Sequence, residues 1–215
     1  AEVAQAGIGM RVYGEELVRE RRRAPGGDLV STVIEGGLDD AELGAFFSLL
    51  FTAGSETTRN SIAVGLLELA ARPEDWRAVA EDPGLRAGAV EEMLRWATPV
   101  YHFRRTATRD IEMYGRTIKS GDKVVAWFAG GNRDPRVFDD PYRFDVTRTR
   151  VDHVTFGKGG PHFCLGNQLA RMEIKIMFQE LIPRLSATPI ALNGEVAHVR
   201  SNFINGIKKF PVRVG

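Results

Sequence analysis

The sequence has a single cysteine, Cys164, among 215 residues, so it cannot close an internal disulfide. We therefore expect a reducing compartment, with a cytoplasmic location as the default. The net charge of +1 gives no support to a nucleic-acid or strongly acidic partner. Long apolar runs are also missing. The longest uncharged stretch of the main helix candidate runs from Leu43 to Ser55, which is too short to span a bilayer.

Helical patterns dominate the first half of the chain. A basic N-terminal helix should end at a Pro-Gly-Gly run, and a long helix is predicted over 39–72. Asp39 and Glu42 have the spacing of a capping box at its start. Apolar residues occupy nearly every face of this helix, which predicts burial on several sides. Two shorter helices are predicted over 73–82 and 85–97.

Strand-type patterns replace the helical ones after Pro99. Segment 101–130 predicts short strands with Gly-containing turns, and segment 131–150, rich in Asp, Arg and Pro, predicts an ordered coil. The tail, 190–214, predicts a hairpin-type region with a turn near Asn193-Gly194. The chain is therefore expected to be mainly α with a small β portion.

The cysteine lies at the end of a Gly-rich stretch, directly before a helix-like run. Glycines let the backbone approach a flat or charged group closely, and a helix N-terminus favours the thiolate form of a cysteine. A single thiolate cannot build a zinc or iron–sulfur site, and the histidines show no ligand spacing with Cys164. It does suffice for haem iron, because the porphyrin supplies the equatorial donors. The alternative is that Cys164 is a small buried apolar residue.

The stretch FGKGGPHFCLG resembles the haem-binding loop of the cytochrome P-450 family. The matching positions are Phe156, Gly157, Gly159, His162, Cys164 and Gly166. The resemblance implies that the chain carries haem b, with Cys164 as the axial iron ligand. The loop is one residue longer than in many bacterial members, as in some actinobacterial members that oxidise sterols and lipids.

The long helix contains TAGSETT, Thr52 to Thr58. The resemblance makes Glu56 the acid and Thr57 the alcohol of a proton relay, at a point where the helix of family members opens locally. It also places Ala53 and Gly54 beside the cofactor. The alternative is an exposed polar patch on a long helix.

Glu92 and Arg95 have the i, i+3 spacing of an ordinary helix ion pair. A surface pair is the alternative, because such pairs are common on exposed helices. The family has a Glu-x-x-Arg motif here, and Arg143 resembles the third member of its buried network. The resemblance implies a structural role for these residues.

Arg105 matches a family arginine that binds a haem propionate, and His162 matches a second propionate contact. Either could instead be an ordinary surface residue. The stretch RSNFINGIKKFPV resembles that of actinobacterial members that oxidise sterols and branched lipids, which implies that the turn Ser201–Ile207 touches the substrate through Phe203 and Ile204.

The resemblance implies a haem-thiolate monooxygenase that inserts one oxygen atom from O2 into a C–H bond of an apolar small molecule, such as a sterol or branched lipid. Electrons would come from NAD(P)H through a ferredoxin-type donor. The alternatives are a peroxygenase or isomerase on the same haem, and a truncated, non-catalytic fragment. The chain is expected to be the C-terminal, haem-binding portion of a single domain over 1–215, with the N-terminal portion absent and the piece alone inactive.

Lys158, Arg171 and Lys175 lie on the thiolate loop and the start of the following helix. They could form a basic rim that steers an acidic ferredoxin, with Glu173 and Glu180 as the nearest acids. An ordinary charged helix face is the equally weighted alternative.

Overall fold

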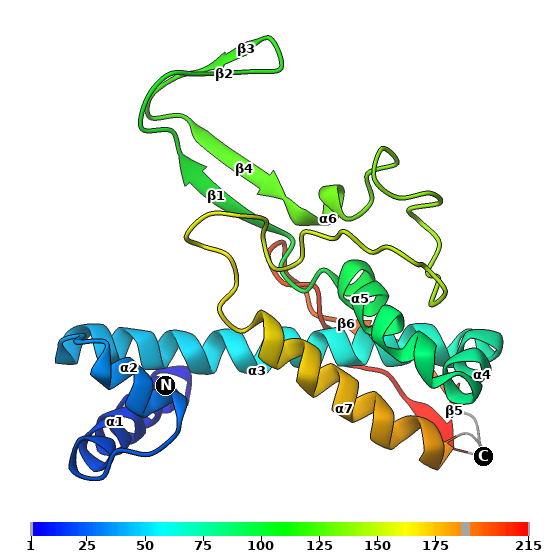
Figure 1. Ribbon diagram of the computed structural model, residues 1–215. Helices are drawn as coiled ribbons and strands as arrows, with labels where there is room; N and C mark the ends of the chain where they lie inside the picture. The colour runs from blue at the N-terminus through cyan, green and yellow to red at the C-terminus, as the bar shows by residue number, and fades with distance from the viewer. Residues whose placement is uncertain (1, 186–189, 215) are drawn as a thin grey trace. The chain divides into compact units, whose positions relative to one another are not determined.

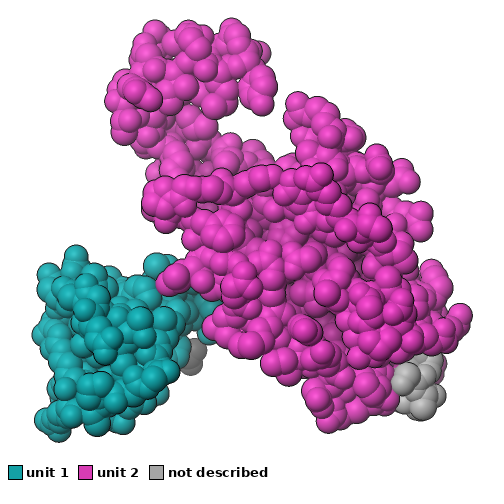
Figure 2. Space-filling view, in the orientation of Figure 1, with its two compact units in different colours: residues 1–56 teal, residues 57–215 magenta. Residues whose placement is uncertain are grey.

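The computed structural model of the chain describes residues 2–185 and 190–214 (Figure 1). It divides into two compact units, residues 1–56 and residues 57–215, which are coloured separately in Figure 2. The boundary falls inside the long helix α3, Asp40–Ala70. Helices dominate and the strands are short, so the predicted fold class is confirmed.

The first unit contains α1 (Glu2–Arg23), α2 (Leu29–Glu35) and the start of α3. Helix α2 was not predicted; it is a short helix whose N-cap Asp28 accepts a hydrogen bond from the Ser31 backbone N–H at 2.9 Å. A small apolar core in this unit contains Val18, Leu43 and Phe47.

The capping box at the start of α3 is confirmed. The Asp39 Oδ1 atom accepts hydrogen bonds from the backbone N–H groups of Ala41 and Glu42 at 2.8 Å. The Glu42 carboxylate in turn accepts a bond from the Asp39 N–H at 3.0 Å. These reciprocal bonds satisfy N–H groups that have no partner within the helix, which explains why α3 begins at this point.

The second unit is built on the rest of α3 together with α4 (Pro73–Glu81), a short 3-10 turn (Pro83–Leu85), α5 (Arg86–Ala97) and α7 (Asn167–Leu185). One core joins these helices, and its buried members are Leu69, Trp76, Val79, Ala89, Val90, Met93, Leu94, Phe144, Val146, Ile174, Phe178, Ile182 and Ile190. The expected burial of the long helix holds for Leu69, which is 1 % exposed, but not for Leu49, which is 65 % exposed.

The region after α5 forms short antiparallel pairs. The elements are β1 (His102–Thr106), β2 (Ile111–Met113), β3 (Arg116–Ile118), β4 (Lys123–Trp127) and the short helix α6 (Phe128–Gly131). Strand β1 pairs with β4, and β2 pairs with β3 across a turn in which Tyr114 and Gly115 have φ values of 50° and 71°. Positive φ at both central residues is the geometry of a tight hairpin turn, so the predicted turn is confirmed.

Segment 132–150 has no regular helix or strand, as predicted. It nevertheless buries Phe138, Phe144 and Val146, so the coil is packed and ordered. Its shape therefore depends on side-chain packing and on hydrogen bonds to other elements.

The C-terminal strands are β5 (Ile190–Leu192), β6 (Ala197–His198), β7 (Ile207–Lys209) and β8 (Val212–Val214). The predicted β region is present, but the predicted hairpin turn near Asn193-Gly194 is wrong. Strand β5 pairs with β8 and β6 pairs with β7, so the loop of this nested hairpin is 199–206. The chain only bends at Gly194, whose φ is 134°, and Asn193 continues the outer pairing by donating its N–H to the Pro211 carbonyl at 2.9 Å.

The burial of α3 makes a testable prediction. Leu69→Ala should lower the free energy of unfolding of the second unit by about 2–5 kcal/mol, because it leaves a cavity in the core. Leu169→Ala, at an exposed position of α7 in the same unit, is the matched control and should change it by less than about 0.5 kcal/mol. Urea unfolding followed by tryptophan fluorescence measures this, since Trp76, Trp96 and Trp127 all lie in the second unit. Equal effects of the two variants would contradict the assignment of the core.

Candidate functional site

The loop that carries Cys164 ends at the N-terminus of α7 (yellow to orange in Figure 1). Cys164 is half-buried, its backbone N–H donates to the Phe156 carbonyl at 3.0 Å, and its own carbonyl accepts a bond from Asn167 Nδ2 at 2.8 Å. Gly157, Gly159 and Gly160 all have positive φ values, between 69° and 79°. Only glycine adopts such values without strain, which explains why the loop is rich in it.

Asn132 fixes the start of this loop. Its buried side-chain Oδ1 accepts the Val154 N–H at 2.8 Å, and its Nδ2 donates to the hydroxyls of Thr98 and Thr155 at 2.8 and 2.9 Å. The Thr155 hydroxyl also donates to the Leu94 carbonyl at 2.9 Å. The loop is therefore tied to the ends of α5 and α6. Asn132 was not predicted as a site residue, because a residue in a coil belongs to no periodic sequence pattern.

Glu92 and Arg95 form a bidentate ion pair with distances of 2.6 and 2.7 Å. Both side chains are 0 % exposed, which excludes the alternative of a surface pair. The remaining Arg95 N–H groups donate to the carbonyls of Asn132, Pro141 and Arg143 at 2.8–3.0 Å. The pair therefore organises the coil 132–150.

The prediction that the Arg143 side chain completes this network is wrong. Arg143 is exposed and contributes only its backbone carbonyl. Arg148 lies there instead: its Nε atom is 3.4 Å from Glu92 Oε2, and its other N–H groups donate to the carbonyls of Asp139 and Asp140 at 2.7 and 3.0 Å. Both arginines lie in the same coil, where spacing alone does not show which one turns inward.

A second ionic cluster, which the sequence analysis missed, lies beside the Cys164 loop. Glu91 accepts hydrogen bonds from Arg171 Nε and Nη2 at 2.7 and 3.0 Å, and its Oε2 atom is 3.0 Å from His153 Nε2. The Arg171 guanidinium lies over the Phe156 ring, 4.5 Å from its centroid. Burial favours the neutral carboxyl, but the hydrogen bonds from His153 and Arg171 outweigh it and lower the pKa of Glu91 to about 2.

This pairing corrects the idea of a basic rim. Arg171 is paired with Glu91, and Lys158 donates to both carboxylate oxygens of Asp152 at 2.8 and 2.9 Å. The nearest acids are thus Asp152 and Glu91, not Glu173 and Glu180. These two cations therefore have local counter-charges, and the docking of an acidic ferredoxin on this rim stays a prediction.

Glu56 and Thr57 are consecutive residues of α3, and both are half-buried. Helix α3 runs through these residues from Asp40 to Ala70. The hydroxyls of Ser55 and Ser61 donate to the carbonyls one turn earlier, at 2.7 and 3.0 Å. Ala53 and Gly54 lie on an exposed stretch of the same helix. The roles of these residues stay predictions.

The predicted propionate ligands are both exposed. Arg105 lies on β1, where its guanidinium donates to the Arg104 carbonyl at 3.0 Å and lies 5.9 Å from the centroid of the Phe103 ring. His162 lies in the glycine-rich loop. An exposed guanidinium and an exposed imidazole are available to an anionic ligand, but the propionate contacts themselves stay predictions.

The turn around Phe203 and Ile204 is attached to the segment before β1. Ile204 forms an isolated bridge with Val100, and the Tyr101 N–H donates to the Phe203 carbonyl at 2.9 Å. The Phe203 ring is 5.8 Å from that of Phe103, centroid to centroid. The turn therefore lies beside the strand that carries Arg105, and its contact with a substrate stays a prediction.

Asn60 packs against the same turn and was not anticipated. Its amide is fully buried, and neither amide atom has a hydrogen-bond partner among the described residues. A Cβ at Gly206 would lie 2.8 Å from Asn60 Nδ2, so only glycine allows the turn to approach α3 this closely. The one feature of the sequence that points to Asn60 is its place one helical turn after Thr57.

The residues around Cys164 fit a haem. Among the described residues there is no cluster of three His, Cys, Asp or Glu side chains that could hold a metal ion, so a metal bound by Cys164 needs its other donors from a ligand. Exposed apolar side chains flank the thiol: Phe163 is 46 % and Leu165 is 72 % exposed. A Cβ at Gly159 or Gly160 would meet no atom within 4 Å, so the loop leaves open space. A cysteine sulfur, apolar neighbours and open space suit a flat apolar cofactor.

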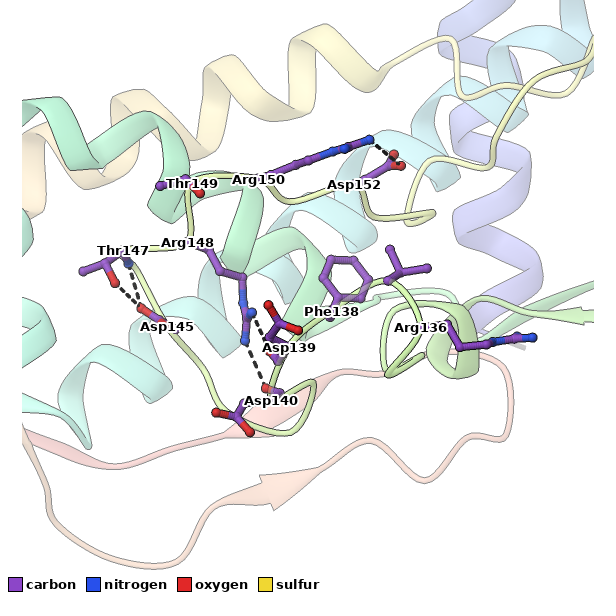
Figure 3. Close-up of a pocket in the computed structure, with 11 residues that line it drawn as sticks. Arg136, Phe138, Asp139, Asp140, Asp145, Thr147, Arg148, Thr149, Arg150 and Asp152 are labelled. Carbon is purple, nitrogen blue, oxygen red and sulfur yellow. Dashed lines mark hydrogen bonds and ion pairs between the residues drawn. The ribbon is translucent and has the colours of Figure 1, made fainter.

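A cavity of about 670 Å³ lies elsewhere, within the coil (Figure 3). Charged side chains line it, among them Arg148, Arg150 and Asp152, with Arg150 paired to Asp152 at 3.7 Å. Cys164 is not among its lining residues. Its polar walls do not suit an apolar substrate.

A family model described as "Cytochrome P450" matches residues 85–210, which include the Glu92–Arg95 pair and the whole Cys164 loop. The chain belongs to the cytochrome P450 family. Among its P450 relatives, the methyl-branched lipid omega-hydroxylase of Mycobacterium tuberculosis is 42 % identical over 217 residues, covering 98 % of this chain and 50 % of the relative. The steroid C26-monooxygenase of Rhodococcus jostii is 40 % identical, over 93 % of this chain and 43 % of its own length.

Solved P450 structures are also similar to this chain. The P450 monooxygenase TamI matches 99 % of this chain and 54 % of its own, with a TM-score of 0.91 and 36 % identity. Mycobacterium marinum cytochrome P450 CYP268A2, solved with pseudoionone, matches 95 % of this chain and 50 % of its own, with a TM-score of 0.88 and 41 % identity. The chain thus spans about half the length of these curated and solved P450 relatives. No helix in the described part of the chain has the length and apolar character needed to cross a membrane.

The assignment of Arg148 to the buried network is testable. Arg148→Ala should lower the free energy of unfolding by about 1.5–3 kcal/mol, because it removes charged hydrogen bonds beside Glu92. Arg143→Ala should change it by less than about 0.5 kcal/mol, since that side chain is exposed. Urea titration of the two variants decides between them. A larger loss in Arg143→Ala would restore the original assignment.

Proposed function

We propose that the protein containing this chain is a haem-thiolate monooxygenase that inserts one oxygen atom from O2 into a C–H bond of an apolar small molecule. One observation carries the proposal: a lone, half-buried cysteine lies at the entrance of α7, in a loop whose shape is fixed by glycines and by the Phe156 carbonyl. Membership of the cytochrome P450 family supports the same activity.

The cofactor of the proposal is haem b. Cys164 would hold the iron, and Arg105 and His162 would bind the propionates through charge-assisted hydrogen bonds. When bound, the haem supplies the activation of O2 and the transfer of oxygen to the substrate. The glycines of the loop let the backbone approach the porphyrin plane, and exposed Phe163 and Leu165 offer it apolar contacts.

Within α3, Thr57 and Glu56 would deliver protons. The Thr57 hydroxyl would donate a proton on the oxygen side of the site, and the Glu56 carboxylate would restore it from solvent. Both are half-buried, which leaves Glu56 some contact with water. A peroxygenase or isomerase would not require this pair.

The substrate class is proposed from the relatives. The names of the curated relatives include a methyl-branched lipid omega-hydroxylase, a steroid C26-monooxygenase and a linalool 8-monooxygenase, whose named substrates are all apolar. We expect a sterol or branched lipid here, in contact with Phe203 and Ile204. The electron donor is proposed to be a ferredoxin reduced by NAD(P)H, and the location cytoplasmic, consistent with the single cysteine.

Replacing the thiol tests the ligation. Cys164→Ser should abolish the thiolate-type spectrum of the reduced, CO-treated protein, because Cys164 is the only thiol in the chain. Cys164→His is the control, since it can retain haem through a nitrogen ligand and should give a non-thiolate spectrum. A thiolate spectrum in either variant would refute the assignment. Failure of the unmodified protein to bind haem would instead favour a non-catalytic fragment.

Removing the alcohol tests the proton relay. Thr57→Ala should leave haem and substrate binding near normal, while product per NAD(P)H consumed falls and peroxide release rises. Thr52→Ala, on an exposed turn of the same helix, is the matched control and should behave as the unmodified protein. An unchanged product yield in Thr57→Ala would exclude the relay.

A further inference from the structure

The hairpin loop 199–206 approaches α3 closely at its last residue, Gly206. This glycine is buried, and a Cβ added to it would lie 2.8, 2.9 and 3.0 Å from Nδ2, Oδ1 and Cγ of Asn60. Gly206 does not have the positive φ at which an L side chain is strained. Contact with the Asn60 amide, and not backbone strain, therefore disfavours a larger residue at this position.

The Asn60 amide is buried at a cost. The side chain is 0 % exposed, and neither of its amide atoms has a hydrogen-bond partner in the part of the chain that the structure describes. Removing an amide from water without a new partner is unfavourable. Other contacts must therefore hold the hairpin loop over it.

These contacts come from the two residues on either side of Gly206. The Asn205 side chain donates from Nδ2 to the Ala97 carbonyl at 2.5 Å, and its backbone N–H donates to the Pro99 carbonyl at 2.9 Å. Ile207 is buried in an apolar cluster with Val64 of α3 and Ala97 of α5. The end of the hairpin loop is thus fixed to two helices, with the Asn60 amide beneath it.

The position of Gly206 is connected to that of Phe203 and Ile204. The Ser201 hydroxyl accepts the backbone N–H groups of Phe203 and Ile204 at 3.1 and 3.0 Å. The Val199 N–H donates to the Gly206 carbonyl at 2.8 Å and joins the two ends of the hairpin loop. Because these bonds hold the loop together, a displacement of Gly206 also displaces Phe203 and Ile204.

We propose that Asn60 and Gly206 are specificity-determining residues, whose contact sets how closely the hairpin loop 199–206 lies to α3. The contact thereby sets the position of Phe203 and Ile204, the side chains expected to touch the substrate. The part that concerns the substrate rests on the proposed function, whereas the part that concerns the position of the loop does not.

Hydrogen exchange in the whole protein that contains this chain tests the contact without a substrate. The Tyr101 and Asn205 N–H groups report on the loop, because they donate to the carbonyls of Phe203 and Pro99 and so join it to the segment before β1. Gly206→Ala should speed their exchange roughly fivefold or more, since an overpacked contact pushes the loop away.

The double variant Asn60→Ala/Gly206→Ala separates this contact from other effects of the new methyl group. Asn60→Ala removes all three atoms that the methyl group would meet, so the double variant should exchange within about twofold of the original rates. Mass spectrometry of peptides that contain Tyr101 or Asn205 measures the exchange. Unchanged exchange in Gly206→Ala, or equally fast exchange in the double variant, would overturn the proposal.

Two further variants complete the test. Asn193→Ala changes an exposed asparagine of the same hairpin and should leave both rates unchanged; acceleration equal to that of Gly206→Ala would contradict the proposal. The N–H groups of α5 should keep their rates in every folded variant. If Gly206→Ala does not fold, Asn60→Gln decides the question: it lengthens the side chain on the other side of the contact and should speed the same two groups, and no acceleration would overturn the proposal.

Two apolar probes of different size connect the contact to the substrate. The dissociation constants of linalool and testosterone are measured from the spectral shift of the haem-loaded protein. Gly206→Ala should change the ratio of the two constants roughly fivefold or more, and the double variant should restore it, because Phe203 and Ile204 are displaced only in the single variant. An unchanged ratio would overturn the role in specificity. If neither probe binds the unmodified protein, the proposed substrate class is wrong, and hydrogen exchange still decides whether the contact positions the loop.

Discussion

The buried ion pair between Glu92 and Arg95 is the constraint on which the rest of the second unit depends. Both side chains are 0 % exposed, and such a pair is tolerated only when its remaining hydrogen-bonding atoms find partners. The coil 132–150 supplies them: its carbonyls accept from Arg95, and the Asp145 N–H donates to Glu92 at 2.9 Å. A segment without helix or strand thereby acquires a fixed path.

That path determines where the thiol lies. The Asn132 carbonyl accepts from Arg95, while the Asn132 side chain holds Val154 and Thr155 at the start of the Cys164 loop. Asn132 thus connects the coil that the ion pair fixes to the start of the Cys164 loop. From the other side, Arg171 and Glu91 fix the helix that follows the loop. The thiol is held between two charged pairs that start from adjacent residues of α5.

Local patterns in the sequence predicted local features well. The capping box of α3, the turn at Tyr114 and the glycine-rich loop before α7 depend on residues that are close in the chain, so spacing was sufficient. Features that depend on distant partners were missed or misassigned. Spacing could not show that Arg148, and not Arg143, faces Glu92, or that β5 pairs with β8. Nor could it show that the counter-ion of Arg171 is Glu91.

The separation of these partners also bears on the order in which the chain acquires its structure. Glu91 and Arg171 are 80 positions apart, and the Asn205 side chain reaches the Ala97 carbonyl across 108 positions. Contacts between such distant segments form slowly, because the loop they close must first lose conformational entropy. During synthesis, α5 emerges long before the residues that complete it. The surroundings of Cys164 therefore cannot be complete until Arg171 has been made and has reached Glu91, so they become ordered later than the helix α5 on which they are built.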